Sequence, residues 1–452
     1  MSQRGLEPAA AACLVPGFDG LTAPEWVRRR GYGGVVLFAR NVRDPEQVAE
    51  LTSSLAGLLV AVDEEGGDVT RLEAADGSSF PGNLALGAVD DVALTRRVAA
   101  AIGGELAAVG VNFDLAPVAD LIVDPANPIV GVRSFGSDPA LVSRHVSAFV
   151  EGLQSVGVAA CAKHFPGHGE SVADSHLELP SVEADREMLY ARALPPFAAA
   201  VEAGVRAVMT AHIRFTALDD EPATLSAKVI GLLRSELGFG GLVMTDALEM
   251  RAIAATAGLE GGAVRALAAG ADALCLGADL APEQVEAVEA AIVAAVREGR
   301  LPEERLLEAA SRVAETAEWA ASPRPRRDRE AGAEAARRAL RVEGDTSLSG
   351  EPLVVELRPE ATIAAGEAKH GLGGIEVREG EQLPPLDELR RVVIVVRDAH
   401  RHAWQRELVP AGTIVVETGL PEWRPPAARG WIATYGAGRA NLEAAAELLA
   451  RG

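Results

Sequence analysis

The chain has 452 residues, of which 48% are hydrophobic and 24% charged, a composition typical of a soluble globular protein with a large core. Its formal net charge of −22 disfavours nucleic acid and anionic membranes as partners, so we expect neither. Cys13, Cys161 and Cys275 lie far apart and form no C-x-x-C pair, which argues against the usual zinc and redox motifs.

The N-terminal segment contains an alanine run that ends at Cys13. This apolar run is too short for a signal peptide or a membrane-spanning helix, and we interpret it as the first strand. Buried free thiols in a reducing compartment are then expected, and we predict a cytoplasmic protein.

Short apolar runs alternate with longer helical patterns in the first two thirds of the chain. The predicted strands are Cys13–Val15, Gly34–Phe38, Leu58–Val62, Val111–Leu115, Val158–Lys163, Ala207–Thr210, Leu242–Thr245 and Ala273–Leu276. The predicted helices include Pro45–Gly57, Ala93–Val109, Pro139–Val156, Arg186–Ala203 and Pro282–Arg297. Strands with so little polar alternation indicate a parallel sheet buried on both faces. Eight such units predict a (β/α)8 barrel of the TIM type, with a doubly wound open sheet as the alternative.

A proline- and arginine-rich stretch at 322–328 interrupts this pattern and reads as a linker. A helix over Arg329–Arg341 and a further series of elements follow it. These are strands at Leu353–Leu357, Val392–Val396, Thr413–Glu417 and Gly430–Tyr435, and a helix at Arg439–Arg451. We therefore predict a barrel domain at 1–321 and a smaller α/β domain at 329–452.

Chemically capable side chains follow several of the predicted barrel strands. They are Asp63, Asp114, Lys163, His164, His212 and Asp246. The carboxyl ends of parallel barrel strands form one rim, where active sites of such barrels lie. Residues far apart in the sequence are therefore expected to converge there.

The segment from Lys163 to His176 is the richest of these, with three histidines, one lysine and two carboxylates. A metal site at His164, His168 and His176 is one interpretation, but no helical H-x-x-x-H spacing supports it, so we predict no metal and no cofactor. Asp174, two residues before His176, is able to hydrogen-bond the imidazole and favour its protonated form. Such a histidine could donate a proton to a leaving group and later accept one from water.

Three further segments carry candidates. Asp246 ends an apolar strand, and its alternative role is the N-cap of a following helix, completed by Glu249. Asp63 is placed to hold two sugar hydroxyls and Arg71 to close over the ligand, although a tight turn with solvated charges would look the same. Arg133 lies in a loop from which it could reach the ligand.

Together the segments resemble glycoside hydrolase family 3, in particular its bacterial β-N-acetylglucosaminidases. The resemblance spans nearly the whole barrel and is most specific in the Lys-His-Phe-Pro-Gly-His-Gly…Asp-Ser-His pattern. The matching segments are Asp63-x-Glu-Gly-Gly, Asn112-Phe-Asp-Leu-Ala-Pro-Val-Ala-Asp120, Arg133-Ser-Phe-Gly, 163–176, Thr210-Ala-His212, Pro222-Ala-Thr-Leu-Ser226 and Thr245-Asp-Ala-Leu-Glu-Met250. One departure is Asp68, which stands where the family usually has an arginine.

The resemblance implies roles for single residues. Asp246 matches the nucleophile, and His176 matches the acid/base with Asp174 as its partner. The positions that hold the terminal N-acetylglucosamine are matched by Asp63, Arg71, Arg133, Lys163 and His164.

The implied activity is that of a retaining exo-β-N-acetylglucosaminidase (a β-N-acetylhexosaminidase) acting on N-acetylglucosamine-containing glycans or muropeptides, through a glycosyl-aspartate intermediate. A phosphorylase on the same scaffold is an alternative, because a histidine tolerates incoming phosphate where a carboxylate base would repel it. A catalytically silent sugar-binding protein is a second alternative, whose signature would be loss of Asp246 or His176. Both residues are present.

Overall fold

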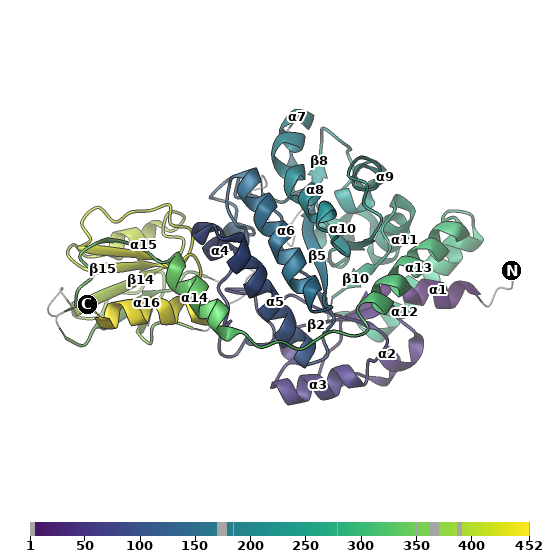
Figure 1. Ribbon diagram of the computed structural model, residues 1–452. Helices are drawn as coiled ribbons and strands as arrows, with labels where there is room; N and C mark the ends of the chain where they lie inside the picture. The colour runs from purple at the N-terminus through teal and green to yellow at the C-terminus, as the bar shows by residue number, and fades with distance from the viewer. Residues whose placement is uncertain are drawn as a thin grey trace.

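The first strands of the chain form a closed parallel barrel in the computed structural model, which describes residues 5–169, 179–183, 185–277, 279–348, 350–360, 370–386 and 391–451 (Figure 1). The strands are β1 (Leu14–Pro16), β2 (Gly34–Leu37), β3 (Leu59–Val62), β4 (Phe113–Asp114), β5 (Ala159–Phe165), β7 (Ala207–Thr210), β9 (Leu242–Thr245) and β10 (Leu274–Leu276). They pair in parallel in the orders β2-β3-β4-β5-β7-β9 and β1-β10.

Two contacts close the ring. A parallel bridge joins Met244 of β9 to Ala273 beside β10, and the Gly33 N–H donates to the Leu14 carbonyl of β1 over 3.2 Å. The predicted (β/α)8 barrel is thus confirmed, and the alternative of an open sheet is wrong.

Alternate residues of the strands are buried on opposite faces, which explains their uniformly apolar sequences. On β3, Leu59 and Ala61 pack inside the barrel with Phe113, whereas Val60 and Val62 pack outward against the helices. Both sets are almost inaccessible to solvent. A strand in this position has no polar face, as expected for a parallel sheet covered by helices.

The helices around the barrel begin where the sequence supplies caps. Asp44, Asp91 and Asp138 cap three of them by accepting backbone N–H groups of the first turn. The helices are α2 (Glu25–Arg30), α3 (Pro45–Ser53), α4 (Asn83–Val89), α5 (Val92–Ala108), α6 (Pro139–Ser155), α7 (Arg186–Met188), α8 (Leu194–Glu202), α9 (Ala227–Gly231), α10 (Arg251–Ala257), α11 (Leu259–Ala269), α12 (Pro282–Arg297) and α13 (Glu303–Trp319).

The N-terminal alanine run differs from its prediction. Residues Leu6–Ala12 form helix α1 and not the first strand, which begins only at Leu14. Alanine has the highest helix propensity, and Ala9, Ala10 and Ala11 are buried in the barrel core cluster. The three cysteines are free and buried, as expected.

A second sheet follows the barrel, with the strand order β11-β16-β15-β14-β12-β13. Its strands are β11 (Arg341–Gly344), β12 (Leu353–Leu357), β13 (Ile375–Val377), β14 (Val392–Val396), β15 (Ile414–Glu417) and β16 (Gly430–Ala433), and only β11 is antiparallel to its neighbour. The helices that accompany it are α14 (Arg329–Ala339), α15 (Ala403–Leu408) and α16 (Arg439–Arg451). Figure 1 shows this sheet beside the barrel, on the side of α4. The exact boundaries at 321 and 329 stay a prediction.

The predicted linker lies against the barrel. The Arg324 N–H donates to the carbonyl of Val156 over 2.6 Å. A Cβ atom at Gly104 of α5 would lie 2.0 Å from the carbonyl oxygen of Arg326, so only glycine allows this approach. Between the two sheets the chain is therefore a strap packed on the barrel (Figure 1).

An ion pair joins the two domains at Asp68. Its side chain is 4% exposed and pairs with Arg397, which follows strand β14. The same carboxylate accepts the N–H of Ala437 over 2.7 Å. Nearby, the His400 ring nitrogen lies 2.9 Å from the Pro125 carbonyl, and Arg439 pairs with Glu73 over 2.9 Å. Asp68, which stands where the resembled family usually has an arginine, thus contacts the second domain.

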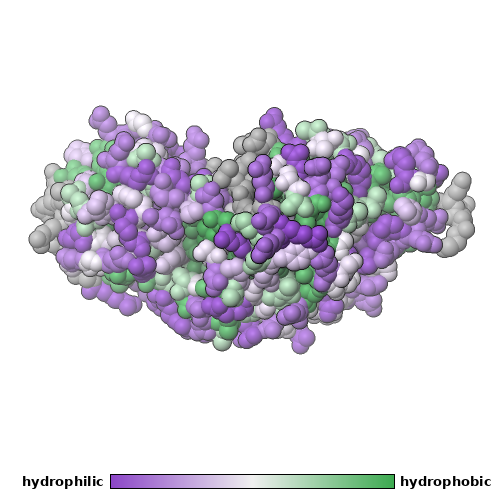
Figure 2. Space-filling view, turned by 90° about the horizontal axis from the view of Figure 1, so that it is seen from above, coloured by the Kyte–Doolittle hydropathy of each residue, from purple (hydrophilic) through white to green (hydrophobic). Residues whose placement is uncertain are grey.

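The outer surface agrees with the acidic composition. Figure 2 shows hydrophilic residues over most of the face seen from above, with smaller hydrophobic areas between them. Among the described helices, none is both long and apolar enough to cross a membrane.

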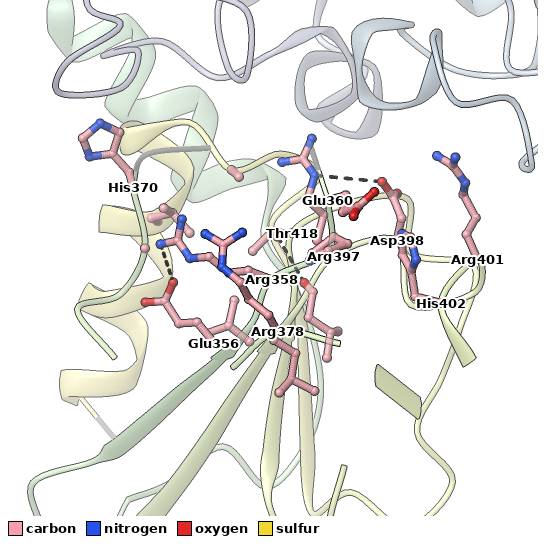
Figure 3. Close-up of a pocket in the computed structure, with 17 residues that line it drawn as sticks. Glu356, Arg358, Glu360, His370, Arg378, Arg397, Asp398, Arg401, His402 and Thr418 are labelled. Atoms are coloured by element: carbon pink, nitrogen blue, oxygen red, sulfur yellow. Dashed lines mark hydrogen bonds and ion pairs between the residues drawn. The ribbon is translucent and has the colours of Figure 1, made fainter. Parts of the chain in front are cut away.

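The domain contact yields a prediction. Asp68→Asn should lower the free energy of unfolding by about 3 kcal/mol, because it removes one partner of a buried ion pair and leaves Arg397 only the more distant Asp398 carboxylate, at 4.0 Å (Figure 3). Chemical denaturation measures this change. The control is Glu25→Gln, which breaks an exposed pair with Arg29 and should have little effect. Equal stability losses in the two variants would contradict the role assigned to Asp68.

Candidate active site

A cavity of about 420 Å³ opens at the carboxyl ends of the barrel strands. This volume lies in the range of small-molecule sites. Six of the predicted site residues line it: Asp63, Arg71, Arg133, Lys163, His164 and Asp246. They come from four separate segments, so the structure brings together what the strand-end argument predicted. The other two, Asp174 and His176, lie outside the described residues.

A chain of ion pairs crosses the floor of the cavity. Lys163, whose side chain is 2% exposed, contacts Asp63 at 2.6 Å and Glu65 at 2.7 Å. Arg133 binds both oxygens of Glu65, at 2.7 and 3.0 Å. Arg71 lies 3.8 Å from Asp63. Asp63 and Arg71 keep 22% and 20% of their side chains exposed and line the cavity, whereas Glu65 is buried and pairs with Lys163 and Arg133.

The pairing sets the charges of this chain. Burial alone would raise the pKa of both Asp63 and Glu65. Lys163 and Arg71 hold the pKa of Asp63 below its usual range. Arg133 and Lys163 do the same for the pKa of Glu65. Burial opposes the charge of Lys163, yet Asp63 and Glu65 raise its pKa above the usual value. All of these groups are therefore ionised at neutral pH, and Asp63 acts as a hydrogen-bond acceptor for sugar hydroxyls.

Asp246 follows β9 directly and borders the cavity. The alternative that it caps a helix is wrong, because α10 begins only at Arg251 and its N-cap is Met250, so Glu249 completes no capping box either. The Asp246 carboxylate instead accepts the N–H of the next residue, Ala247, over 2.8 Å. A non-helical turn between strand and helix leaves the carboxylate at the rim.

His212 steadies this turn. Its Nε2 lies 2.9 Å from the Ala247 carbonyl and its Nδ1 lies 2.8 Å from the hydroxyl of Thr224. Thr224 in turn contacts Thr210 at the end of β7 over 2.9 Å. The sequence placed His212 at the rim, and the structure gives it a positioning role next to Asp246.

Asp120 organises the start of the histidine-rich segment. Its carboxylate accepts the backbone N–H of His168 over 2.6 Å and lies 2.7 Å from Nδ1 of His164. His168 also borders the cavity, and burial, aided by His164, lowers its pKa to about 4, so its ring is neutral at pH 7. Neither Asp120 nor Glu65 received a role from the sequence. Their partners are distant along the chain. The only feature of the sequence that pointed to them was their place in the Asp63-x-Glu-Gly-Gly and Asn112–Asp120 motifs.

Two buried carboxyls lie beneath the Asp63 turn. Glu64 accepts the N–H groups of Arg71 and Leu72 at 2.9 and 3.0 Å, and its own N–H donates to Asp114. Burial raises the pKa of Glu64 to about 7 and that of Asp114 well above its usual value. Glu64 thus shapes the loop that presents Arg71 to the cavity.

Within the described residues, no group of three or more histidine, cysteine, aspartate or glutamate side chains is arranged to hold a metal ion. The prediction that no metal is needed stays a prediction, because His176 was one of the candidate ligands.

The fold and the cavity define a class of protein: a barrel enzyme whose polar rim receives a small polar substrate. The family described as glycosyl hydrolase family 3, N-terminal domain, matches residues 18–316. The chain belongs to this family, and the resemblance stated from its motifs is confirmed.

Similar proteins agree with this assignment. A β-N-acetylglucosaminidase of the same family from Paenibacillus sp. has a solved structure that covers 98% of this chain and 96% of its own, at 33% identity and a TM-score of 0.87. A β-hexosaminidase from Xanthomonas euvesicatoria is 36% identical over 301 residues, which are 63% of this chain and 90% of that protein. A β-hexosaminidase A from Pseudoalteromonas piscicida is 38% identical over 257 residues, but the match spans only 43% of its length.

The buried Glu64 predicts a pH dependence. A carboxyl whose pKa is raised on folding, from about 4.5 to about 7, contributes stability that is fully present below pH 4.5 and is lost as the pH rises to 7. The free energy of unfolding of the wild type should therefore fall relative to Glu64→Gln across this window, by roughly 3 kcal/mol. Denaturation curves between pH 4 and 8 measure this. Glu46→Gln, at an exposed position of α3, is the matched control. A difference between wild type and Glu64→Gln that does not change with pH would rule the effect out.

Proposed function

We propose that this protein is a retaining exo-β-N-acetylhexosaminidase that releases terminal β-linked N-acetylglucosamine. One observation carries the proposal: a carboxylate at the rim, Asp246, shares a cavity with a separate ionised cluster built on Asp63 and Lys163. One part of the site is available for covalent chemistry and the other for holding a sugar. The family and the names of the relatives above support the same activity.

The sugar-holding part is the chain of ion pairs. Asp63 has oxygens that accept hydroxyl protons, and Arg71 and Lys163 donate to hydroxyl or carbonyl oxygens of the same ring. Because Lys163 is held between two carboxylates, its ammonium is fixed before the substrate arrives. Preorganised donors of this kind hold the ring without a cost for reordering them during the reaction.

The chemistry is a double displacement. Asp246 attacks the anomeric carbon as the glycosidic bond breaks, and His176 donates a proton to the departing oxygen. His176 then takes a proton from water, which attacks the glycosyl-aspartate and releases the sugar with retained configuration. Asp174 favours the protonated imidazole for the first step. The His212–Ala247 contact keeps the Asp246 turn in place through both.

We assign the natural substrate to fragments of peptidoglycan and the site of action to the cytoplasm. The substrate assignment rests on the resemblance of the histidine-rich motif to bacterial enzymes that act on such fragments. The cytoplasmic assignment is supported by the three free, buried cysteines, which fit a reducing compartment.

The substrate assignment is tested with an aryl β-N-acetylglucosaminide and the matching aryl glucoside. We expect turnover of the first and little of the second, with free N-acetylglucosamine as the product in the presence and absence of phosphate. Formation of N-acetylglucosamine 1-phosphate at the expense of free sugar would show a phosphorylase instead. Absence of turnover under all conditions would show a binding protein.

Replacing the nucleophile is the sharpest test of the site. Asp246→Asn should retain the fold and lower kcat by several orders of magnitude, because an amide forms no glycosyl ester. The control is Asp279→Asn, a matched change in a residue that also borders the cavity but is 80% exposed and paired with Arg40. A 2-fluoro sugar should be trapped on the peptide that contains Asp246. Near-normal turnover of Asp246→Asn, or trapping on another peptide, would rule out this nucleophile.

The role of His176 is tested by comparing turnover of substrates with good and poor leaving groups. His176→Ala should damage substrates with poor leaving groups far more than activated aryl glycosides, because only the former need protonation. With activated substrates, azide should partly restore turnover by replacing the water that His176 would activate. Asp174→Asn should show a milder form of this pattern and a shifted pH profile. Equal losses across the leaving-group series, without azide rescue, would place the proton donor elsewhere.

A further inference from the structure

Asp120 meets three segments of the active site without lining its cavity. Its side chain is fully buried and contacts His164 and the backbone of His168. Its own carbonyl accepts the hydroxyl of Ser134 over 2.6 Å, next to the cavity residue Arg133. A residue in this position acts on a ligand only through the groups that it holds.

The Asp120 carboxylate is in contact only with nitrogen atoms. Oδ1 accepts the backbone N–H of His168 over 2.6 Å, and the backbone nitrogen of His164 lies 3.3 Å from Oδ1 and 3.2 Å from Oδ2. Oδ2 also lies 2.7 Å from Nδ1 of the His164 ring. Backbone N–H groups only donate, so both oxygens act as acceptors. The proton of the 2.7 Å contact therefore belongs to Nδ1.

This contact decides what the other ring nitrogen of His164 offers to a ligand. The ring lines the cavity, and 9% of the side chain is exposed. Because Nδ1 is bound to Asp120, Nε2 is the nitrogen left for a ligand, and it forms no hydrogen bond with any of the described residues. In a neutral imidazole with its proton on Nδ1, Nε2 is an acceptor. It then requires a donor from the ligand, such as a hydroxyl group.

We infer that Asp120 is a positioning residue that selects the ring form of His164 in which Nε2 accepts a hydrogen bond from one sugar hydroxyl. The inference rests on the activity proposed above for the identity of the ligand. Lys163 and Arg71 only donate, so His164 joins Asp63 as an acceptor in this cavity. In the other ring form, His164 would be a further donor, and the site would no longer require a proton on that hydroxyl.

Asp120→Asn should reverse the selection. The amide oxygen is expected to stay with the backbone N–H of His168, which makes the shortest contact of the carboxylate. The amide NH2 group then faces Nδ1 of His164 and donates to it, so the ring proton moves to Nε2. Asparagine has nearly the shape of aspartate, and the variant therefore changes the pattern of donors more than the packing.

The ring form is measured by nitrogen-15 NMR of the full-length protein labelled at histidine, above the usual titration range of imidazole. The chain has 8 histidines, and the His164 signals are those that disappear in His164→Gln. We expect the proton on Nδ1 in the wild type and on Nε2 in Asp120→Asn. A wild-type ring with a proton on Nε2 would overturn the inference. This measurement needs no turnover, so its failure is distinguishable from failure of the proposed activity.

Fluorinated substrates test the contact with the hydroxyl. Aryl β-N-acetylglucosaminides that carry fluorine in place of the hydroxyl at C3, C4 or C6 lose the donor at that position. For one of the three, kcat/KM of the wild type should fall by about tenfold more than that of Asp120→Asn, because only the wild-type ring requires a donor. The inductive effect of fluorine on the reaction is the same in both proteins and cancels in this comparison.

The control is Asp220→Asn, a matched change at an exposed position outside the cavity, which should keep the wild-type ratios. A role of Asp120 in stability alone would lower kcat/KM for every substrate by the same factor. That outcome, or an unchanged ring form in Asp120→Asn, would overturn the inference. If Asp120→Asn does not fold, the position of the ring proton in the wild type still decides the question.

Discussion

The site depends on keeping the Lys163 ammonium charged where water hardly reaches it. A buried charge without a partner costs several kcal/mol, so the ammonium needs the two carboxylates that contact it. The second of these, Glu65, needs a cation of its own and has Arg133. Strand β5, the turn after β3 and the loop at Arg133 are thereby fixed to one another. Removing any member takes a counter-charge from at least one other member, which explains why the cluster forms as a unit.

The barrel was largely predictable from the sequence because its strands are buried on both faces. Leu59–Val62 is apolar throughout, and Leu242–Thr245 is apolar except for its last residue. The residues capable of chemistry, Asp63 and Asp246, directly follow these runs. The convergence of Asp63, Lys163 and Asp246 then needed only the rule that parallel strand ends share a rim. The pairing among them was not predictable, since Glu65 and Arg133 are 68 residues apart.

Local patterns failed where tertiary contacts override them. Asp246 and Glu249 have the spacing of a capping box, yet the helix starts later because the intervening turn is held by His212 and by the Ala247 N–H. In the second sheet, the predicted strands are those with buried runs, such as β14. The missed strands β11 and β13 are short and mostly exposed, so they lack the apolar signal on which the prediction depended.

The Asp68–Arg397 contact has a consequence for how such chains diverge. An aspartate at position 68 is acceptable because an arginine from the second domain reaches it. In a homologue that consists of the barrel alone, the same carboxylate would lack its counter-charge, and selection would favour another residue there. Positions 68 and 397 should therefore change together among relatives with both domains. The residue at position 68, five residues after Asp63, should therefore differ between relatives with and without the second domain.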